Sequence, residues 1–447
     1  MNLDTQLSQT NQLRTLIRNA ALILTMDPSI GAGELGVLEE ADLLLVGDKI
    51  AAVGKHLREG GGQIVDATGK IVMPGFVDVH NHLWQSLIRG CQADQDLNGW
   101  LETCVFPLAN PAITPSETEI YAGVRLSTLD LVMTGVTTVV DWSHSFSPAF
   151  VRGNIHALKE SGLRFVFAYR GHANSAIIDD IKRVKEDLID PHPRASFQVA
   201  SHPGASSRLF PHLQAMSSLA TDLGVKLHVH LLENIAQRQD DAIKGLLLAN
   251  AMGPDLLGAH AIHLLDEEIT LLAQKDVRVA HNPLSNMRLA SGIIRLPLLH
   301  QAGVKVGLGL DGGTNDTSDM FNTMRVAVGL QRATSLQASV FPTVSEVLRM
   351  ATLGGAEVLD MATRIGSLTP GKQGDVLILD PGSANFAPRL NWINQLVFNG
   401  QPANVDWVFV DGQTLKAGGQ VVGVDPAPIM QTAGEAGRRI KEALHIP

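Results

Sequence analysis

Cysteine is almost absent from this chain. Only Cys91 and Cys104 occur among 447 residues, which is too few for a disulfide framework or a cysteine-rich metal site. We expect both thiols to be reduced, as is usual in the cytoplasm.

Long apolar runs and an excess of positive charge are also missing. ALILTM is too short to cross a membrane, and no other run approaches the ~20 apolar residues needed. The start, MNLDTQLSQTNQLRTL, lacks the basic and apolar regions of a signal peptide. The net charge of −10, from 35 Lys and Arg against 45 Asp and Glu, argues against nucleic acid or an anionic membrane as partner. We therefore expect a soluble cytoplasmic protein.

The two ends of the chain are rich in short β-type runs separated by turns. TLIRNAALILTM and ADLLLVGDKIAAVG lie within residues 1–71, and GDVLILD and NVDWVFVDGQTLKAGG lie within residues 366–447. Glycine-containing breaks between them are typical of hairpins. The pattern predicts one small β domain built from both ends, with a terminal helix.

Residues 72–365 alternate strand-like and helical segments. Eight strand-like runs occur, from IVMPGFVDV to VKVGLGLDGG, and repeated strand–helix units of this number predict a closed (β/α)8 barrel. The first clear helix is predicted to begin with Thr114 as N-cap and Glu117 as its capping-box partner, and to stop at Gly135.

In such barrels the chemistry lies at the C-terminal ends of the strands. Every predicted strand ends in a polar or ionisable side chain: His80 and His82, Asp141, Arg170, His202, His230 with Glu233, His260, His281, and Asp311. Individually, Asp141 could cap a loop, Arg170 could be a surface residue and His202 a turn residue. Their convergence at eight strand ends favours a functional site.

His80 and His82 point the same way, because side chains at i and i+2 share one face of a strand. Two imidazoles in an apolar interior are costly unless their nitrogens are satisfied, and a divalent metal ion does this well. With His230 and Asp311 they form a plausible ligand set for zinc or iron. Metal-bound water is acidic enough to supply hydroxide near neutral pH.

Three side chains are placed to move protons or stabilise charge at this site. Asp311 can take the proton of the water, and Glu233 can deliver one to the substrate. His260 can stabilise the group that gains charge. Four other histidines have simpler interpretations. His228 is expected to be a packed, hydrogen-bonded barrel residue, His263 to be structural or to support a residue of the site, and His144 and His300 to be loop or helix residues.

With these motifs the chain resembles the amidohydrolase superfamily over nearly its whole length. PGFVDVHNH is similar to the family's first-strand HxH motif, HLLE to the HxxE of its deaminases, GAHAIHL to the sixth-strand histidine and LGLDGG to the final metal aspartate. The β-rich ends resemble the family's small β-sandwich. SFQVASHPG lacks the strand-four lysine of some binuclear members, which implies one divalent ion per subunit. The resemblance makes zinc the expected ion, in preference to iron.

The branch of the family is indicated by further stretches. HNPLSNMRLASG and RGCQADQDLNGWLE resemble the cytosine, S-adenosylhomocysteine and methylthioadenosine deaminases, in which His202 and Arg170 match substrate-binding positions. LWQ, residues 83–85, resembles triazine hydrolases and oxidised-guanine deaminases instead. DGGTNDTSDM departs from the branch's usual sequence after the metal aspartate, and a second arginine of that branch has no counterpart.

The resemblance implies a hydrolytic deaminase that removes an exocyclic amine from an N-heterocycle such as an aminopurine or adenosine derivative. A triazine-type chlorohydrolase and a non-catalytic scaffold are the alternatives. The partners expected are a small heterocyclic substrate, water and further copies of the chain in a dimer or tetramer. The expected substrate contacts are Gln85, Trp84, Trp100, Arg170, His202 and His281.

Overall fold

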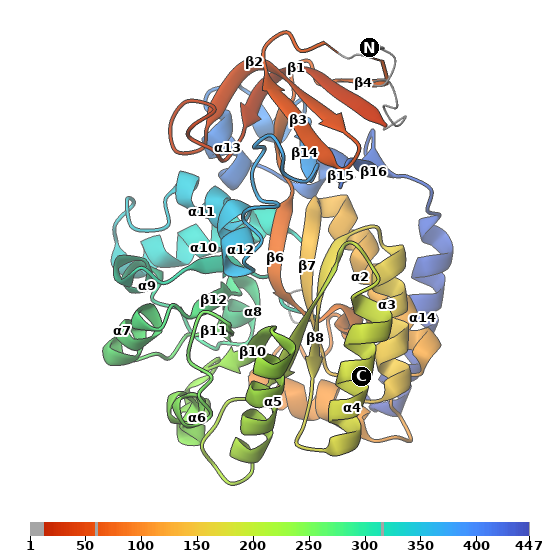
Figure 1. Cartoon of the computed structure of the whole chain (residues 1–447), viewed down its shortest axis with the longest axis vertical. Coiled ribbons are helices and arrows are strands. Elements are labelled where there is room, and N and C mark those ends of the chain that lie inside the picture. The colour runs from red at the N-terminus through yellow and green to blue at the C-terminus, as the bar shows by residue number, and fades with distance from the viewer. Residues whose placement is uncertain (1–12, 59–60, 314–316, 447) are drawn as a thin grey trace, which may run out of the picture.

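The computed structural model describes residues 13–58, 61–313 and 317–446. Its strands form two sheets, a small mixed sheet at one end and a barrel beside it (Figure 1). The small sheet contains β1 (Arg14–Leu24), β2 (Val37–Val46), β3 (Lys49–Gly54), β4 (Gln63–Asp66), β5 (Ile71–Pro74), β14 (Val376–Leu379), β15 (Val405–Val410), β16 (Gln413–Ala417) and β17 (Gln420–Val421). The predicted β domain from both chain ends is confirmed.

The two chain ends meet where β5 pairs in parallel with β1 and antiparallel with β14. On its other side from β2, the first half of β1 pairs with β4 and its second half with β5. The register between β1 and β2 shifts between Ile17 and Ala20. Fully buried Ile17, Ile378 and Phe409 belong to the apolar core of this sheet. Gly75 then leads into the barrel, where a Cβ would meet Thr137 Oγ1 at 2.0 Å.

The barrel has eight parallel strands that neighbour one another in chain order. They are β6 (Phe76–Asn81), β7 (Val136–Ser143), β8 (Arg164–Arg170), β9 (Ala195–Ser201), β10 (Lys226–Leu231), β11 (Leu256–His260), β12 (Arg278–His281) and β13 (Val306–Leu308). Each coincides with one of the predicted runs, so the (β/α)8 prediction is confirmed.

The barrel closes where the end of β6 meets the chain after β13. Asn81 and Asp311 form a parallel bridge. The Asp311 N–H donates to the His80 carbonyl at 2.8 Å, and the His82 N–H donates to the Asp311 carbonyl at 3.2 Å. The buried Asp78 carboxylate also accepts the Leu310 N–H, at 2.9 Å. This seam brings the first and last predicted metal ligands together.

Helices surround the barrel (Figure 1). The principal ones are α2 (Glu117–Thr134), α3 (Pro148–Glu160), α4 (Ser175–Arg183), α5 (Phe210–Leu223), α6 (Ala242–Leu248), α7 (Asp266–Gln274), α8 (Pro283–Arg288), α9 (Leu296–Ala302), α10 (Met320–Ser335), α11 (Val344–Met350), α12 (Leu353–Val358), α13 (Trp392–Phe398) and α14 (Pro426–Ala443). The predicted terminal helix, α14, packs against α2. Short helical segments follow β6: η2 (Leu83–Ile88), α1 (Leu97–Trp100), η3 (Leu101–Val105) and η4 (Phe106–Ala109).

The predicted N-cap of α2 is wrong by two residues. Ser116 is the cap, and its hydroxyl and the Glu119 side chain form a reciprocal capping box. The helix begins at Glu117, so Thr114 lies before the cap, and its hydroxyl donates to the carbonyls of Leu108 and Asn110. The predicted stop at Gly135 is confirmed, with a left-handed φ of 93°.

Within the described ranges, no helix has the length and apolar character needed to cross a membrane. The first twelve residues, which carry most of the stretch used to argue against a signal peptide, lie outside the described residues, as do residues 314–316 of the DGGTNDTSDM stretch.

Candidate active site

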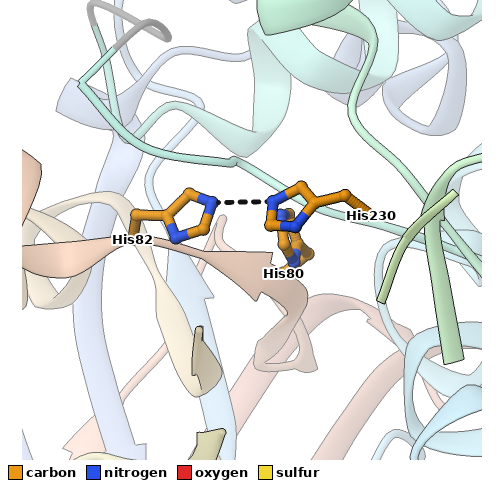
Figure 2. A group of neighbouring side chains, drawn as sticks. All are labelled: His80, His82 and His230. Atoms are coloured by element: carbon orange, nitrogen blue, oxygen red, sulfur yellow. Dashed lines mark hydrogen bonds between the residues drawn. The ribbon is translucent and has the colours of Figure 1, made fainter. Parts of the chain in front are cut away.

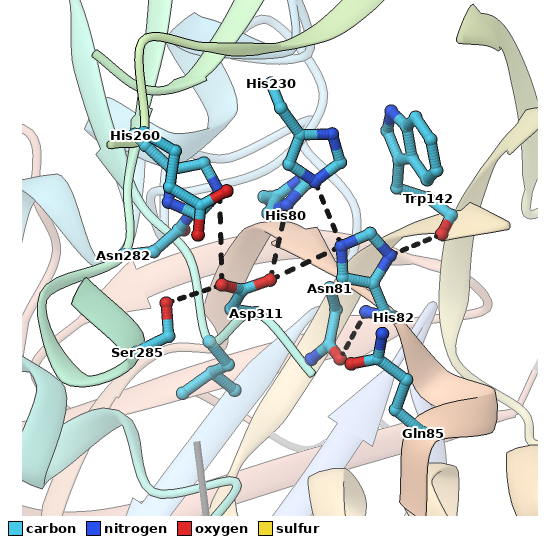
Figure 3. A network of polar contacts seen from close by, with 12 residues as sticks. His80, Asn81, His82, Gln85, Trp142, His230, His260, Asn282, Ser285 and Asp311 are labelled. Atoms are coloured by element: carbon cyan, nitrogen blue, oxygen red, sulfur yellow. Dashed lines mark hydrogen bonds and ion pairs between the residues drawn. The ribbon is translucent and has the colours of Figure 1, made fainter. Parts of the chain in front are cut away.

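The four predicted metal ligands converge at the barrel seam. The Nε2 atoms of His82 and His230 lie 3.1 Å apart, with His80 beside them (Figure 2). Asp311 Oδ1 is 3.4 Å from Nε2 of both His80 and His82 (Figure 3). The three imidazoles form one group that could hold a metal ion, and His80 and Asp311 form a second with His260. The four residues lie in or shortly after β6, β10 and β13, which are far apart in sequence.

The donor atoms fit a divalent cation. Burial lowers the pKa of His82 to about 4 and that of His230 well below its usual value, so both rings are neutral at neutral pH. His82 Nδ1–H donates to the Trp142 carbonyl at 2.6 Å, which leaves a lone pair on Nε2 facing His230. His80 Nε2 is buried and has no hydrogen-bond partner within the described part of the chain. A cation between these atoms would satisfy all of them.

A chain of hydrogen bonds through the barrel interior fixes the tautomer of His80. Gln198 Oε1 accepts from His228 Nδ1–H at 2.9 Å. His228 Nε2 is then the acceptor for His80 Nδ1–H, at 3.0 Å, and the lone pair of His80 Nε2 points toward Asp311. The prediction that His228 is a packed, hydrogen-bonded barrel residue is confirmed, and it orients a ligand as well.

Glu233 and His260 lie beside this cluster. His260 Nε2 is 3.6 Å from Glu233 Oε2 and 3.9 Å from Asp311 Oδ2. Burial, reinforced by the Asp311 charge, raises the pKa of Glu233 well above its usual value. This shift favours the protonated carboxyl, which is the form of Glu233 that can act as an acid.

Helix α8 holds two of these side chains. Ser285 Oγ donates to Asp311 Oδ2 (Figure 3), and the Asn286 amide contacts His260 Nδ1 at 2.8 Å. His260 and Asp311 both have positive φ, 73° and 61°, a conformation that is costly for residues other than glycine and that occurs at functional sites. Sequence reasoning missed Ser285 and Asn286, although HNPLSNM contains them.

A cavity of about 80 Å³ opens over the cluster. Four of the predicted substrate contacts, Gln85, Trp100, Arg170 and His202, line it together with Glu233, His260 and the leucines Leu97, Leu101 and Leu289. Trp100 Nε1 and Arg170 Nε are buried and without hydrogen-bond partners among the described residues. Burial lowers the pKa of Arg170 to about 10, so its guanidinium is still charged at neutral pH and suits an oxygen-bearing ligand.

The other two predicted contacts, Trp84 and His281, are not among the residues that line this cavity. Both are buried, and the Trp84 indole N–H donates to His144 Nδ1 at 3.0 Å. His144, expected to be a loop or helix residue, lies in the loop after β7 and also lines the cavity, with its ring centroid 5.0 Å from that of His82. The sequence signal for this role was its position three residues after Asp141, directly after strand β7.

Gln85 links η2 to the loop after β13. Its Oε1 accepts the Gly313 N–H at 2.9 Å, and a Cβ on Gly312 would lie only 1.9 Å from that oxygen. The glycines after Asp311 are therefore required by Gln85. Asp141 likewise has structural partners, because its buried carboxylate accepts from the Leu83 N–H at 3.0 Å and the Asn154 amide at 2.7 Å.

A larger chamber of about 480 Å³ adjoins the inner cavity. Arg170, His202, Leu101 and Phe106 line both spaces, and the chamber extends outward to His172, Arg208, His212 and Asp240. A ligand at the metal cluster thus has room to extend past Arg170.

Residues 71–415 match the Amidohydrolase family, and the chain belongs to this family. It is 32% identical over 443 residues to the 5-methylthioadenosine/S-adenosylhomocysteine deaminase of Desulforudis audaxviator, which covers 97% of this chain and 100% of that protein. It is 31% identical to the 5'-deoxyadenosine deaminase of Methanobrevibacter smithii, over 90% and 94% of the two chains. The predicted family, and with it a hydrolase acting on C–N bonds, is confirmed.

Solved structures share the fold. An adenosine deaminase from Xanthomonas campestris with bound zinc superposes with a TM-score of 0.87 at 24% identity, over 96% of this chain and 99% of that one. An atrazine chlorohydrolase from Arthrobacter aurescens in complex with zinc gives 0.85 at 23% identity, over 95% and 100%.

Proposed function

We propose that the chain is a metal-dependent deaminase that replaces the exocyclic amine of an adenosine derivative by a carbonyl oxygen. The observation that carries the proposal is the buried Glu233 carboxyl, which lies 3.6 Å from His260 and beside the imidazole cluster at the inner cavity. The names of relatives about 30% identical over nearly the whole chain support the same reaction.

The proposed cofactor is one divalent ion per chain, zinc in preference to iron, held by His80, His82, His230 and Asp311. When bound, such an ion supplies Lewis-acid chemistry that makes water acidic near neutral pH. Strand β9 ends at Ser201 and is followed by His202, so it offers no lysine for a second ion.

The protein groups account for the proton movements. Asp311 takes a proton from the attacking water, and Glu233 gives its proton to the ring nitrogen next to the carbon under attack. His260 is placed to donate a hydrogen bond to the oxygen that gains negative charge. Asp311 passes the proton that it took from water to the amine, which leaves as ammonia. The hydroxyl proton of the intermediate goes to the Glu233 carboxylate, and the water oxygen remains on the ring as the carbonyl.

The shape and charge of the cavity favour a nucleoside over a free base. A bare heterocycle needs only the inner cavity, whereas a sugar with a 5' substituent would occupy the adjoining chamber of about 480 Å³. Arg170 lines both spaces, and its buried Nε atom has no hydrogen-bond partner among the described residues. Its guanidinium suits sugar hydroxyls or an anionic substituent.

The test is a release assay on purified, zinc-loaded protein with 5'-deoxyadenosine, methylthioadenosine, S-adenosylhomocysteine, adenosine, adenine, a pterin and a chlorinated triazine. We expect ammonia from the adenosine derivatives. Chloride from the triazine with no ammonia from any compound would support the triazine hydrolase alternative, which Gln85 at the cavity wall favours. No product from any of them would point to a scaffold.

The assembly and location of the protein belong to this proposal too. A dimer or tetramer in the cytoplasm is expected, and sedimentation of the purified protein and fractionation of cells would test the two statements separately.

A further inference from the structure

Two asparagine amides contact the imidazole of His260 at the barrel rim. Asn286, on α8, places its Nδ2 atom 2.8 Å from His260 Nδ1. Asn282, directly before α8, places its Nδ2 atom 3.3 Å from Nδ1 and 3.4 Å from Nε2, so it does not select one nitrogen over the other. Both asparagines are buried. Of the two, Asn286 is therefore the side chain that can fix the position of the ring proton.

The burial of His260 leaves its ring a single proton to place. The side chain is fully buried, and burial disfavours the charged imidazolium. A neutral imidazole carries its proton on one nitrogen and a lone pair on the other. Nε2 lies 3.6 Å from Glu233 Oε2 and 3.9 Å from Asp311 Oδ2. The Asp311 carboxylate attracts a proton on the nitrogen that faces it and repels a lone pair there.

The surroundings of Asn286 indicate the same arrangement. Its Oδ1 atom is buried and has no hydrogen-bond partner among the described residues. If the amide were turned, Oδ1 could accept a proton from Nδ1, but the NH₂ group would take the unpaired position and both of its N–H groups would lack an acceptor. Buried donors without partners are costly. An NH₂ group that donates to the Nδ1 lone pair therefore costs less, and it leaves the ring proton on Nε2.

The location of this proton decides what His260 can do. With Nε2 protonated, the ring can donate a hydrogen bond into the space between Glu233 and Asp311, but it has no lone pair there for a cation. With the proton on Nδ1, the Nε2 lone pair could bind a cation, because His80, His260 and Asp311 lie close enough together to hold one.

We propose that Asn286 is a positioning residue that holds the His260 proton on Nε2, so that His260 donates a hydrogen bond to the reacting oxygen and stays outside the metal ligand set. The identity of that oxygen, which comes from the attacking water, rests on the proposed function. Asn286 is not among the residues that line the inner cavity, so it acts through His260.

The first experiment locates the proton by nuclear magnetic resonance on the full-length, zinc-loaded protein with ¹⁵N-labelled histidine. The His260 signal is identified by its absence from His260→Gln. We expect a proton on Nε2 and none on Nδ1 in the wild type and in Asn282→Ala. Asn286→Asp replaces the donating NH₂ group by an acceptor of the same size and should place a proton on Nδ1. A proton on Nδ1 in the wild type or in Asn282→Ala, or an unchanged ring in Asn286→Asp, would overturn the proposal.

The second experiment measures kcat and KM for ammonia release, with the zinc content of the same preparations. In Asn286→Leu and Asn286→Asp, which both lose the donor at similar volume, we expect kcat to fall roughly 10- to 100-fold, as for other residues that orient groups around a metal. KM and zinc content should stay unchanged. Met287→Ala, exposed on the same helix, is the matched control and should keep the wild-type kcat.

A purely structural role for Asn286 predicts a different result. Unchanged kcat in both Asn286 variants, or a loss of zinc together with a raised KM, would overturn the positioning role. If the wild type releases ammonia from no substrate, the proposed function fails, while the resonance measurement still tests where the His260 proton lies.

Discussion

Replacing Glu233 by glutamine tests the central acid of the proposed mechanism. The side chain keeps its volume but can no longer give or take the proton. Glu233 is only 4% exposed, so water cannot readily substitute as the proton donor. General acid–base catalysis contributes roughly 10²- to 10⁴-fold, which corresponds to about 3–5 kcal/mol of transition-state stabilisation. We expect kcat to fall by that factor.

The metal content should stay unchanged in Glu233→Gln, because none of the proposed ligands is altered. The assay is steady-state ammonia release combined with elemental analysis of the same preparation. Glu267→Gln is the matched control, since Glu267 is exposed on α7. If Glu233→Gln kept more than about a tenth of its turnover, the proton would have to come from elsewhere, with His260 the first group to test. A parallel loss of metal would instead assign Glu233 to the ligand set.

Four further predictions follow from the same geometry. Elemental analysis should find about one divalent ion per active chain, with activity lost in a strong chelator and restored by added zinc; two ions per chain would contradict a mononuclear site. Gln198→Leu should weaken zinc affinity by about 10- to 100-fold, because the hydrogen bonds that orient His80 lose their last acceptor; unchanged affinity in a zinc titration would show that this chain does not act on the ligand. Arg170→Met should raise KM for adenosine derivatives far more than for a free base, and equal effects on both substrates would contradict the proposal that Arg170 contacts the sugar. Gln85→Ala should instead lower the thermal stability, because the hydrogen bond to the Gly313 N–H is lost. Burial raises the pKa of Asp141 from 3.8 to about 7, so the folded metal-free protein binds more protons than the unfolded chain between these pH values. Its unfolding temperature should therefore fall as the pH rises from about 4 to about 7. In calorimetry, Asp141→Asn should show a weaker dependence of the unfolding temperature on pH in this range.

The structure indicates that Asp141→Asn can keep the hydrogen bonds that Asp141 makes. Asparagine at position 141 can still accept the Leu83 N–H through its oxygen. Asn154 Oδ1 is buried and lacks a hydrogen-bond partner among the described residues, so a rotated Asn154 amide can accept from the new NH₂ group. If the variant kept the full pH dependence of the wild type, other groups would be responsible for it.

The barrel could be predicted from the sequence because its signal is local and repeated. Each strand carries its own β-branched run and ends in its own polar residue, from His80 to Asp311, and the order of strands follows the order of the chain. The convergence of His80, His82, His230 and Asp311 follows from closure of such a barrel, since parallel strand ends meet at one rim.

What the sequence could not show is which side chains support the site from neighbouring elements. Ser285 reaches Asp311 and Asn286 reaches His260 only because α8 begins directly after β12 and crosses the rim. His144 and Trp84 contact each other across sixty positions, and no local pattern distinguishes Trp84, which is buried behind the wall, from Trp100, which faces the cavity. For α2, Thr114 and Ser116 are both residue types that cap helices, and the sequence alone did not distinguish between them.

The position of the cluster at the seam links the fold to the chemistry. Asp311 contributes its backbone to the bridge with Asn81 and its carboxylate to the imidazoles, and His80 and His82 supply the backbone partners on the other side. These residues can therefore present a complete ligand set only when β6 and the chain after β13 are joined. A cation held between them would bind the closed barrel and not the open one, so its binding free energy stabilises closure as well as activating water. The positive φ of Asp311 costs conformational free energy, and the binding free energy of the cation can offset that cost. This explains why an aspartate can occupy a backbone conformation that a glycine would adopt more easily.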